Sequence, residues 1–181
     1  MIIVDRRDED SLVKIFNDYR ILVDKGMMSP SVLEGFQDLD NLKGYTDSGN
    51  VKLLYKKDQN GNYGGLMLFE MLFMTPQSKL LEYFKNFREC SEIFDSNEIV
   101  QHPTFFEIGF SNEGLVAQIH LIESFSKGTG FEMFNWLKKQ QINGIFLHSL
   151  ESAVDSYLSW GMKHTGYYFR NENEPILVYH N

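Results

Sequence analysis

Apolar side chains recur at helical spacing in the first part of the chain. Between Asp8 and Gly26 they fall on one face every three or four residues, which predicts an amphipathic helix with acidic capping residues at its start and a glycine at its end. Its inward face carries Leu12, Ile15, Phe16, Tyr19, Leu22 and Val23. Ser29 and Pro30 predict the start of a second, shorter helix. The residues that this second helix would bury are Val32, Phe36 and Leu39.

Runs of apolar residues bounded by turn residues predict the strands. The runs are Met1–Asp5, Val51–Tyr55, Tyr63–Phe73, Thr104–Phe110 and Leu115–Glu123. The pair Asn60-Gly61 predicts an antiparallel hairpin between the second and third runs. The polar segment from Ser111 to Gly114 predicts another hairpin between the fourth and fifth runs.

Helical and strand-like segments alternate in the rest of the chain. Thr75-Pro76-Gln77-Ser78 predicts the start of a helix that runs to about Phe94 and buries Leu80, Phe84 and Phe87. The later elements are a helix over Phe131–Gln141, a strand over Gly144–Ser149, a helix over Ser152–Trp160, and strands over Tyr167–Arg170 and Ile176–His180. No linker, repeat or low-complexity segment interrupts this order, which predicts one mixed α/β domain over residues 1–181.

Composition and charge narrow the class of protein. With 181 residues, 43% of them hydrophobic, and a single cysteine, Cys90, we expect an ordinary globular domain without disulfides that works in the cytoplasm. No apolar run reaches the roughly 18 residues that a membrane span requires. A net charge of −8 makes nucleic acid an improbable partner. The acidity favours a cationic substrate or a basic partner, or it only keeps the protein in solution.

A glycine-rich turn, Ser126-Lys127-Gly128-Thr129-Gly130, lies between a predicted strand and a predicted helix. The N-terminus of a helix presents unpaired amide N–H groups and the positive end of the helix dipole, which suit a pyrophosphate. Glycines at 128 and 130 let the main chain approach such a group closely, and Lys127 adds a positive charge. The alternative is that the two glycines only turn the strand into the helix.

The C-terminal half resembles the GNAT superfamily of acyl-CoA-dependent N-acyltransferases. In that superfamily a strand, a glycine-rich turn, a long helix, a strand, a short helix and two closing strands follow one another. Gly128 and Gly130 match its pattern Gln/Arg-x-x-Gly-x-Gly/Ala, whereas Phe125 stands at the Gln/Arg position. A second pattern is matched by Ala153, Tyr157 and Gly161, with Met162 where an aromatic residue is common.

The resemblance implies a mixed α/β fold: a mostly antiparallel, twisted sheet with one splayed parallel pair and helices on both faces. It also implies acetyl-CoA as co-substrate, with its pyrophosphate on the turn from Ser126 to Phe131. The thioester would lie between the strand ending near Glu123 and the strand at Ile145–Leu147. Tyr157 matches the family tyrosine that protonates the departing thiolate, which a phenol can do because it keeps its proton at neutral pH. The alternative is that Tyr157 is only a packed aromatic residue.

The base that removes a proton from the amine has several candidates. Glu70 lies in a run in which the other seven of eight side chains are apolar, and a desolvated carboxylate there would suit a base. His120 alternates with Ile119 and Leu121 and would take up a proton near neutral pH. Glu107 is a third candidate, because it lies in the predicted strand Thr104–Phe110. Each of them has an ordinary structural alternative, as a solvated, ion-paired or core residue.

Three further expectations complete the sequence-based hypothesis. The five histidines show no metal-ligand spacing, so no structural metal is expected. The acceptor is expected to be a free amine on a small molecule or a protein, and a homodimer is possible. The competing hypothesis is a catalytically silent GNAT-like module that binds a protein partner, and the departures at Phe125 and Met162 keep this alternative open. Acyl transfer to tRNA or DNA would need a basic patch that the composition does not provide.

Overall fold

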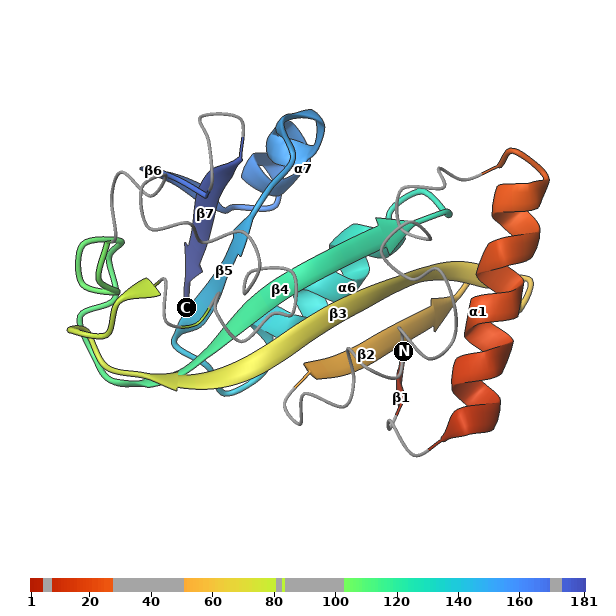
Figure 1. Cartoon of the computed structure of the whole chain (residues 1–181), viewed down its shortest axis with the longest axis horizontal. Coiled ribbons are helices and arrows are strands. Elements are labelled where there is room, and N and C mark those ends of the chain that lie inside the picture. Colours follow the sequence, from red (N-terminus) through yellow and green to blue (C-terminus); the bar gives the residue numbers. More distant parts are fainter. Residues whose placement is uncertain (5–7, 28–50, 81–82, 84–102, 170–173) are drawn as a thin grey trace, which may run out of the picture. The chain divides into compact units, whose positions relative to one another are not determined.

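A computed structural model of the chain describes residues 1–4, 8–27, 51–80, 83, 103–169 and 174–181. Its elements are β1 (Ile2–Val4), α1 (Glu9–Asp24), β2 (Val51–Lys57), β3 (Tyr63–Met74), β4 (Gly114–Ser124), α6 (Thr129–Lys138), β5 (Gly144–His148), η1 (Glu151–Ala153), α7 (Val154–Ser159), β6 (Lys163–Tyr168) and β7 (Pro175–His180). The strands form a seven-stranded sheet in the order β1-β2-β3-β4-β5-β7-β6 (Figure 1). Pairs β1–β2, β2–β3, β5–β7 and β6–β7 are antiparallel, and β4–β5 is parallel.

Contacts divide the chain into two compact units. Unit 1 comprises residues 1–70 and 121–135, and unit 2 comprises residues 71–120 and 136–181. The single domain expected over residues 1–181 therefore stays a prediction.

Helix α1 of unit 1 follows the predicted pattern closely. The Asp8 carboxylate caps it by accepting the Ser11 backbone N–H at 3.1 Å and the Ser11 hydroxyl at 2.6 Å. These two hydrogen bonds, the side-chain one first, lower the pKa of Asp8 below its ordinary value. The chain leaves the helix at Gly26, whose φ of +67° is a conformation that favours glycine.

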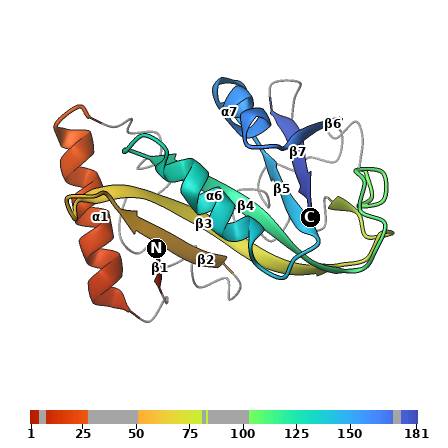
Figure 2. The same ribbon diagram turned by 180° about the vertical axis from the view of Figure 1, so that it is seen from behind.

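The core of unit 1 lies between α1 and the strands. Its buried members are Val4, Leu12, Ile15, Tyr19, Val51, Leu53, Tyr55, Tyr63, Leu66 and Leu68. On β3, Gly65 lies against the start of α6, because a Cβ there would lie 3.0 Å from Thr129 Cγ2 and 3.3 Å from Met133 Cε. The tightest contact would be with the backbone oxygen of Glu123 on β4, at 2.6 Å, so only glycine fits between β4 and α6 here. Unit 1 thus has α1 and the start of α6 on opposite faces of β3, as Figures 1 and 2 show.

Strands β2 and β3 form the predicted antiparallel hairpin, with Val51 opposite Glu70 and Lys57 opposite Tyr63. The Asp58 carboxylate organises the loop by accepting the backbone N–H groups of Asn60 and Asn62, each at 2.8 Å. The hairpin expected from Asn60-Gly61 is confirmed.

In unit 2 the parallel pair is short. Val116 pairs with Gly144 and Gln118 with Phe146, and the β4–β5 ladder ends there. Strand β5 continues to His148, but beyond Phe146 it pairs only with β7, up to His148 opposite Ile176. The two parallel strands therefore separate toward their carboxyl ends, which confirms the predicted splay.

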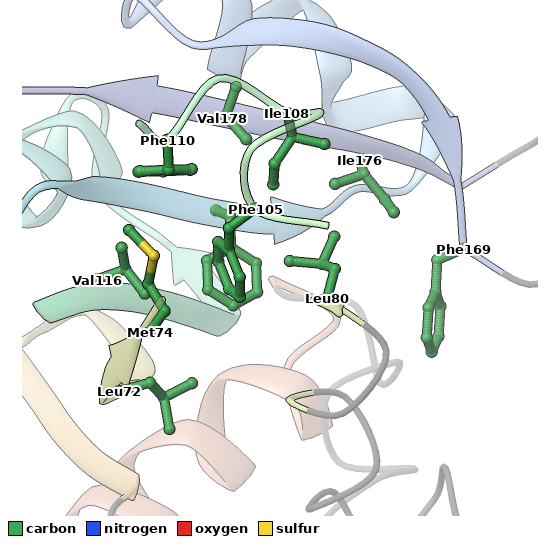
Figure 3. Close-up of a cluster of buried hydrophobic side chains, with 11 residues drawn as sticks. Leu72, Met74, Leu80, Phe105, Ile108, Phe110, Val116, Phe169, Ile176 and Val178 are labelled. Atoms are coloured by element: carbon green, nitrogen blue, oxygen red, sulfur yellow. The ribbon is translucent and has the colours of Figure 1, made fainter. Parts of the chain in front are cut away.

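An aromatic cluster forms the core of unit 2 (Figure 3). Its buried members are Leu72, Met74, Leu80, Phe105, Ile108, Phe110, Val116, Phe146, Phe169, Ile176 and Val178. Phe105 is fully buried, and its ring makes edge contacts with Phe110 and Phe146 at centroid distances of 5.7 and 5.4 Å. Phe105 therefore joins the turn after Pro103 to strand β5.

The strand predicted over Thr104–Phe110 is wrong, and with it the second hairpin. These residues form a helical turn in which the Glu107 carboxylate accepts the Thr104 N–H at 2.7 Å and the Thr104 hydroxyl at 2.9 Å. The Glu107 N–H donates back to the Thr104 hydroxyl at 3.3 Å, as in a capping box. Gly109, with φ +100°, ends the turn. The Thr-x-x-Glu spacing competes with the apolar pattern and decides the local structure.

Other boundaries shift by a few residues. Strand β6 begins at Lys163 rather than at Tyr167, the last helix begins as the short η1, and α6 begins at Thr129 and ends at Lys138. Leu80 is buried as expected. The helix predicted from Ser29-Pro30, and most of the one predicted to reach Phe94, lie outside the described residues.

Candidate active site

The glycine-rich turn joins β4 to α6 in unit 1. Gly64 O accepts the backbone N–H groups of Phe125 and Ser126 at 2.9 and 3.1 Å, and Ser126 O accepts the Thr129 N–H at 3.1 Å. The Gly130 N–H donates to the Ser124 hydroxyl oxygen at 3.2 Å. These bonds fix the shape of the turn before any ligand enters.

The backbone N–H groups of Lys127 and Gly128 have no hydrogen-bond acceptor among the residues that the structure describes. Gly128 has φ +85°, and a Cβ at this position would meet nothing within 4 Å. Glycine is therefore favoured here by backbone conformation, since the space around it is open. Adjacent amides at the start of a helix form an anion site.

A pocket of about 270 Å³ opens beside the turn. Its lining comes from the turn, the first turn of α6 and the β2–β3 hairpin, namely Lys56, Asp58, Gln59, Asn60, Ser126, Lys127, Thr129 and Glu132. Lys56 forms an ion pair with Glu132, so the carboxylate nearest the helix N-terminus is neutralised. Sequence reasoning found the turn but missed the hairpin wall, because the strand pairing alone brings Lys56 and Asp58 to it.

The position of Phe125 in the structure explains why the chain departs from the family pattern there. Its partly buried side chain packs against the core of unit 1, so it belongs to the hydrophobic interior and contributes no charge to the turn. An anion bound here would depend on main-chain amides and on Lys127.

Glu70 lies on β3 in unit 1, opposite Val51 of β2. The side chain is buried, with 3% of its surface exposed, so the sequence-based expectation that it is removed from water is confirmed. Its role as a base stays a prediction.

A second titratable group of unit 1 was not foreseen. Burial raises the pKa of Glu123, near the end of β4, and burial followed by the Glu123 charge raises the pKa of Tyr63. Tyr63 packs against Tyr19 and Tyr55, each at a centroid distance of 5.8 Å. The hydroxyls of Tyr55 and Tyr63 are buried without a hydrogen-bond partner among the described residues. Unit 1 thus holds a carboxyl and phenols that favour their neutral forms.

Glu123→Gln is expected to raise the melting temperature at pH 7 but not near pH 4. The pKa of Glu123 is higher in the folded than in the unfolded protein, so the stability that this carboxyl contributes is present below its unfolded pKa and is lost as pH rises through its folded pKa. An amide does not incur this loss. Melting curves at pH 4, 5.5 and 7 test the prediction, with the exposed Glu113→Gln as the control. Equal shifts for both variants at all three values would contradict it.

Tyr157 lies on the short helix α7 in unit 2 and is half-buried. Its ring meets Trp160 edge to face, at a centroid distance of 5.2 Å and an interplanar angle of 80°. The backbone carbonyl of Tyr157 accepts the Met162 N–H at 3.1 Å, and Met162 is buried. Met162 therefore serves as a core residue after Gly161. The proposed acid role of Tyr157 stays a prediction.

His120 and Gln118 lie two residues apart on β4, in unit 2. His120 is half-buried, whereas Gln118 is 1% exposed and its side-chain carbonyl oxygen has no hydrogen-bond partner among the described residues. Glu107, the third sequence candidate for the base, is exposed, and hydrogen bonds from Thr104 lower its pKa. The lowered pKa makes Glu107 a weaker proton acceptor. Glu107 was proposed because it was predicted to lie in a strand, and that placement was wrong.

Sequence reasoning also missed a pair of titratable side chains at the end of β5, His148 and Glu174. His148 Nδ1 lies 3.2 Å from Glu174 Oε2, and its ring stacks on Phe169 at a centroid distance of 4.3 Å. No spacing rule reveals this pair, since the β5–β7 register brings His148 beside the start of β7.

Within the described ranges, no three His, Cys, Asp or Glu side chains group so that they could hold a metal ion. In the same part of the chain, none of the helices combines the length and the apolar character that crossing a membrane would take.

The order of elements around the turn decides the fold. Strand β4, the glycine turn, α6, β5, the short helix η1–α7, and strands β6 and β7 follow in the order that the sequence suggested, and β4 and β5 form the parallel pair. This order and the parallel pair match the fold that the resemblance to the GNAT superfamily implied. The apparent extra strand before the glycine turn, Thr104–Phe110, is a helical turn, so it no longer conflicts with that fold.

Comparisons with known proteins give likenesses to solved structures at low identity. No protein-family model and no curated protein matches the sequence. A bacterial toxin of known structure is 12% identical, with a TM-score of 0.50 over 84% of this chain and 78% of the toxin. A GNAT-family acetyltransferase from Listeria monocytogenes is 15% identical, with a TM-score of 0.48 over 99% of this chain and 94% of its own. NAA60 of Arabidopsis thaliana, solved with a bisubstrate analogue, is 12% identical, with a TM-score of 0.49 over 92% of this chain and 91% of NAA60. These likenesses concern the fold alone.

Proposed function

We propose that this protein is an N-acyltransferase that transfers an acetyl group from acetyl-CoA to a primary amine by direct attack, in the cytoplasm. The observation that carries the proposal is the glycine turn at the start of α6. It combines two amides that have no acceptor within the described ranges, a lysine and an adjoining pocket, in a GNAT-like fold. The acceptor is a small molecule or a protein.

The turn fits the diphosphate of the coenzyme. The amides of Lys127 and Gly128 donate hydrogen bonds to it, the Lys127 ammonium balances its charge, and the dipole of the ten-residue α6 adds to the attraction. The amides of Ser126, Thr129 and Gly130 hold the turn in shape, and Phe131 is the first exposed apolar residue of α6. Acetyl-CoA supplies an activated thioester when bound.

The chain's own groups move the protons. Tyr157 donates its phenolic proton to the thiolate that leaves, since a neutral phenol is an acid for a sulfur anion. Glu70 on β3 or His120 on β4 takes the proton that the amine loses.

Acetyl-CoA is expected to raise the melting temperature by about 5 to 11 °C at a concentration of a hundred times its dissociation constant. This corresponds to about 2.7 kcal/mol of linked binding, at roughly 2 to 4 °C per kcal/mol for a protein of this size. Lys127→Met should weaken acetyl-CoA about tenfold, which is the loss of one charge-assisted contact. Lys139→Met, an exposed lysine outside the pocket, is the matched control.

The same measurement tests the silent-module alternative, which Phe125 favours because it brings no charge to the turn. Adenosine, which has no phosphate, serves as the comparison ligand. Acetyl-CoA at millimolar concentration with no shift, or a shift matched by adenosine, would remove the transferase proposal.

A further inference from the structure

The ammonium group of Lys56 reaches the pocket beside the glycine turn from the β2–β3 hairpin, within unit 1. The Cα partner of Lys56 on β3 is Gly65, and a Cβ on Gly65 would meet Thr129 and Met133 of α6. Cross-strand partners send their side chains to the same face of a sheet, so Lys56 leaves the sheet on the face that α6 covers. There its ammonium group forms an ion pair with Glu132.

This ion pair is partly open to water. The Lys56 side chain is 22% exposed and the Glu132 side chain is 56% exposed. An ion pair in such surroundings shifts an equilibrium by no more than about fivefold. A phosphate dianion carries more charge than a carboxylate and offers three acceptor oxygens. Such a group is therefore able to displace Glu132 from Lys56.

The pocket suits polar groups of a ligand. Lysine, acidic, amide and hydroxyl side chains make up its lining among the described residues, without an apolar or aromatic side chain. Most ligand pockets are lined by apolar groups, so a wholly polar lining favours phosphate and ribose over a stacked base. Lys127 comes from the turn and Lys56 from the hairpin. Two anionic groups of one ligand are thus able to pair with the two lysines separately.

The charges of the lining balance before a ligand enters. Its charged residues are two lysines and two acids: Lys56, Lys127, Asp58 and Glu132. Asp58 is tied to the hairpin loop, because its carboxylate accepts two backbone N–H groups at 2.8 Å. Glu132 lies in the first turn of α6 and occupies Lys56. A polyanion therefore finds a free cation on the hairpin only when Glu132 gives up its partner.

We propose that Lys56 is the specificity-determining residue that pairs with the ribose 3′-phosphate of acetyl-CoA, and that Glu132 occupies Lys56 until this phosphate takes its place. The inference rests on the proposed function, in which Lys127 and the amides of the turn hold the diphosphate. It assigns the second cation of the pocket to the remaining phosphate group of the coenzyme. A phosphate monoester is close to a dianion at neutral pH. Glu132 acts as an internal anion that competes with it.

Calorimetric titration of the full chain with acetyl-CoA and with acetyl-3′-dephospho-CoA tests the role of Lys56. The protein should bind acetyl-CoA about tenfold more tightly than the dephospho form, which corresponds to one charge-assisted contact. Lys56→Met should reduce this preference to less than about twofold, by weakening acetyl-CoA alone. Lys57→Met is the matched control and should keep the preference, because Lys57 is the adjacent, exposed lysine outside the pocket lining.

Glu132→Gln is expected to have the opposite effect. Loss of the carboxylate frees Lys56, so the preference for acetyl-CoA over the dephospho form should rise about threefold. In the Lys56→Met background the same change should not restore the preference, because the cation that pairs with the phosphate is absent. Glu113→Gln, an exposed acid outside the pocket lining, is the control.

Two further measurements separate binding from stability. Without ligand, Lys56→Met and Glu132→Gln should each change the melting temperature by less than about 4 °C, because an exposed ion pair contributes little. Lys56→Arg keeps the positive charge and should retain most of the preference for acetyl-CoA. A loss of preference in Lys56→Met together with its retention in Lys56→Arg assigns the effect to the charge.

Separate outcomes overturn the two proposals. If acetyl-CoA binds but the dephospho form binds equally well, or if Lys56→Met keeps the preference, the role of Lys56 fails and the transferase remains. A lower preference in Glu132→Gln would mean that Glu132 positions Lys56, which overturns its role as a competitor. Binding of neither coenzyme form at millimolar concentration would overturn the proposed function and the role of Lys56 together.

Discussion

Tyr157→Phe is expected to lower turnover by about 10²- to 10⁴-fold while acetyl-CoA binding is retained. The substitution removes only the hydroxyl, and the ring keeps its edge contact with Trp160. Without a proton donor, the thiolate must leave as an anion, and general acids contribute rate factors of this size. The main chain of α7 is unaffected, because the Met162 N–H still donates to the carbonyl of residue 157.

The measurement compares kcat with the melting shift that acetyl-CoA produces. Tyr168→Phe is the matched control, because Tyr168 is an exposed tyrosine on β6 of the same unit. An acid role requires a loss of turnover in Tyr157→Phe alone. Unchanged turnover would leave Tyr157 as a packing residue, which is the alternative that the sequence kept open.

Phe105→Ala is expected to destabilise unit 2 by about 3 to 5 kcal/mol, the usual cost of emptying a buried aromatic site. Phe105 is fully buried, and its ring meets Tyr83 at 4.9 Å, Phe110 at 5.7 Å and Phe146 at 5.4 Å between centroids. The surrounding rings come from separate segments and have little freedom to close the cavity. At roughly 2 to 4 °C per kcal/mol, the melting temperature should fall by about 6 to 20 °C.

The adjacent residue supplies the control. Phe106 is 66% exposed, so Phe106→Ala should change the free energy of unfolding by less than about 0.5 kcal/mol. Thermal and urea denaturation of both variants test the contrast. Equal losses would mean that the turn from Thr104 to Phe110, rather than the buried ring, carries the stability.

Much of the fold could be predicted from the sequence, because interactions between residues close together in the chain determine it. The period of three to four in α1, the Asn60-Gly61 hairpin and the glycine turn before α6 are each set by residues close together in the chain, and all three are found in the structure. The same reasoning failed at Thr104–Phe110, where an apolar run hid a capping pair. Thr104 and Glu107 satisfy each other's polar groups within one turn, so the segment makes only an isolated antiparallel bridge, between Thr104 and Lys79.

The sequence by itself determined the glycine turn and the order of elements from β4 to β7, since these follow from periodicity and backbone conformation. Only the tertiary structure decided which groups meet. The Lys56–Glu132 pair beside the turn, the charge of Glu123 near Tyr63 and the His148–Glu174 pair all join residues from different elements. Their partners are set by strand register and helix packing, and a one-residue change in register would turn a side chain to the opposite face of the sheet.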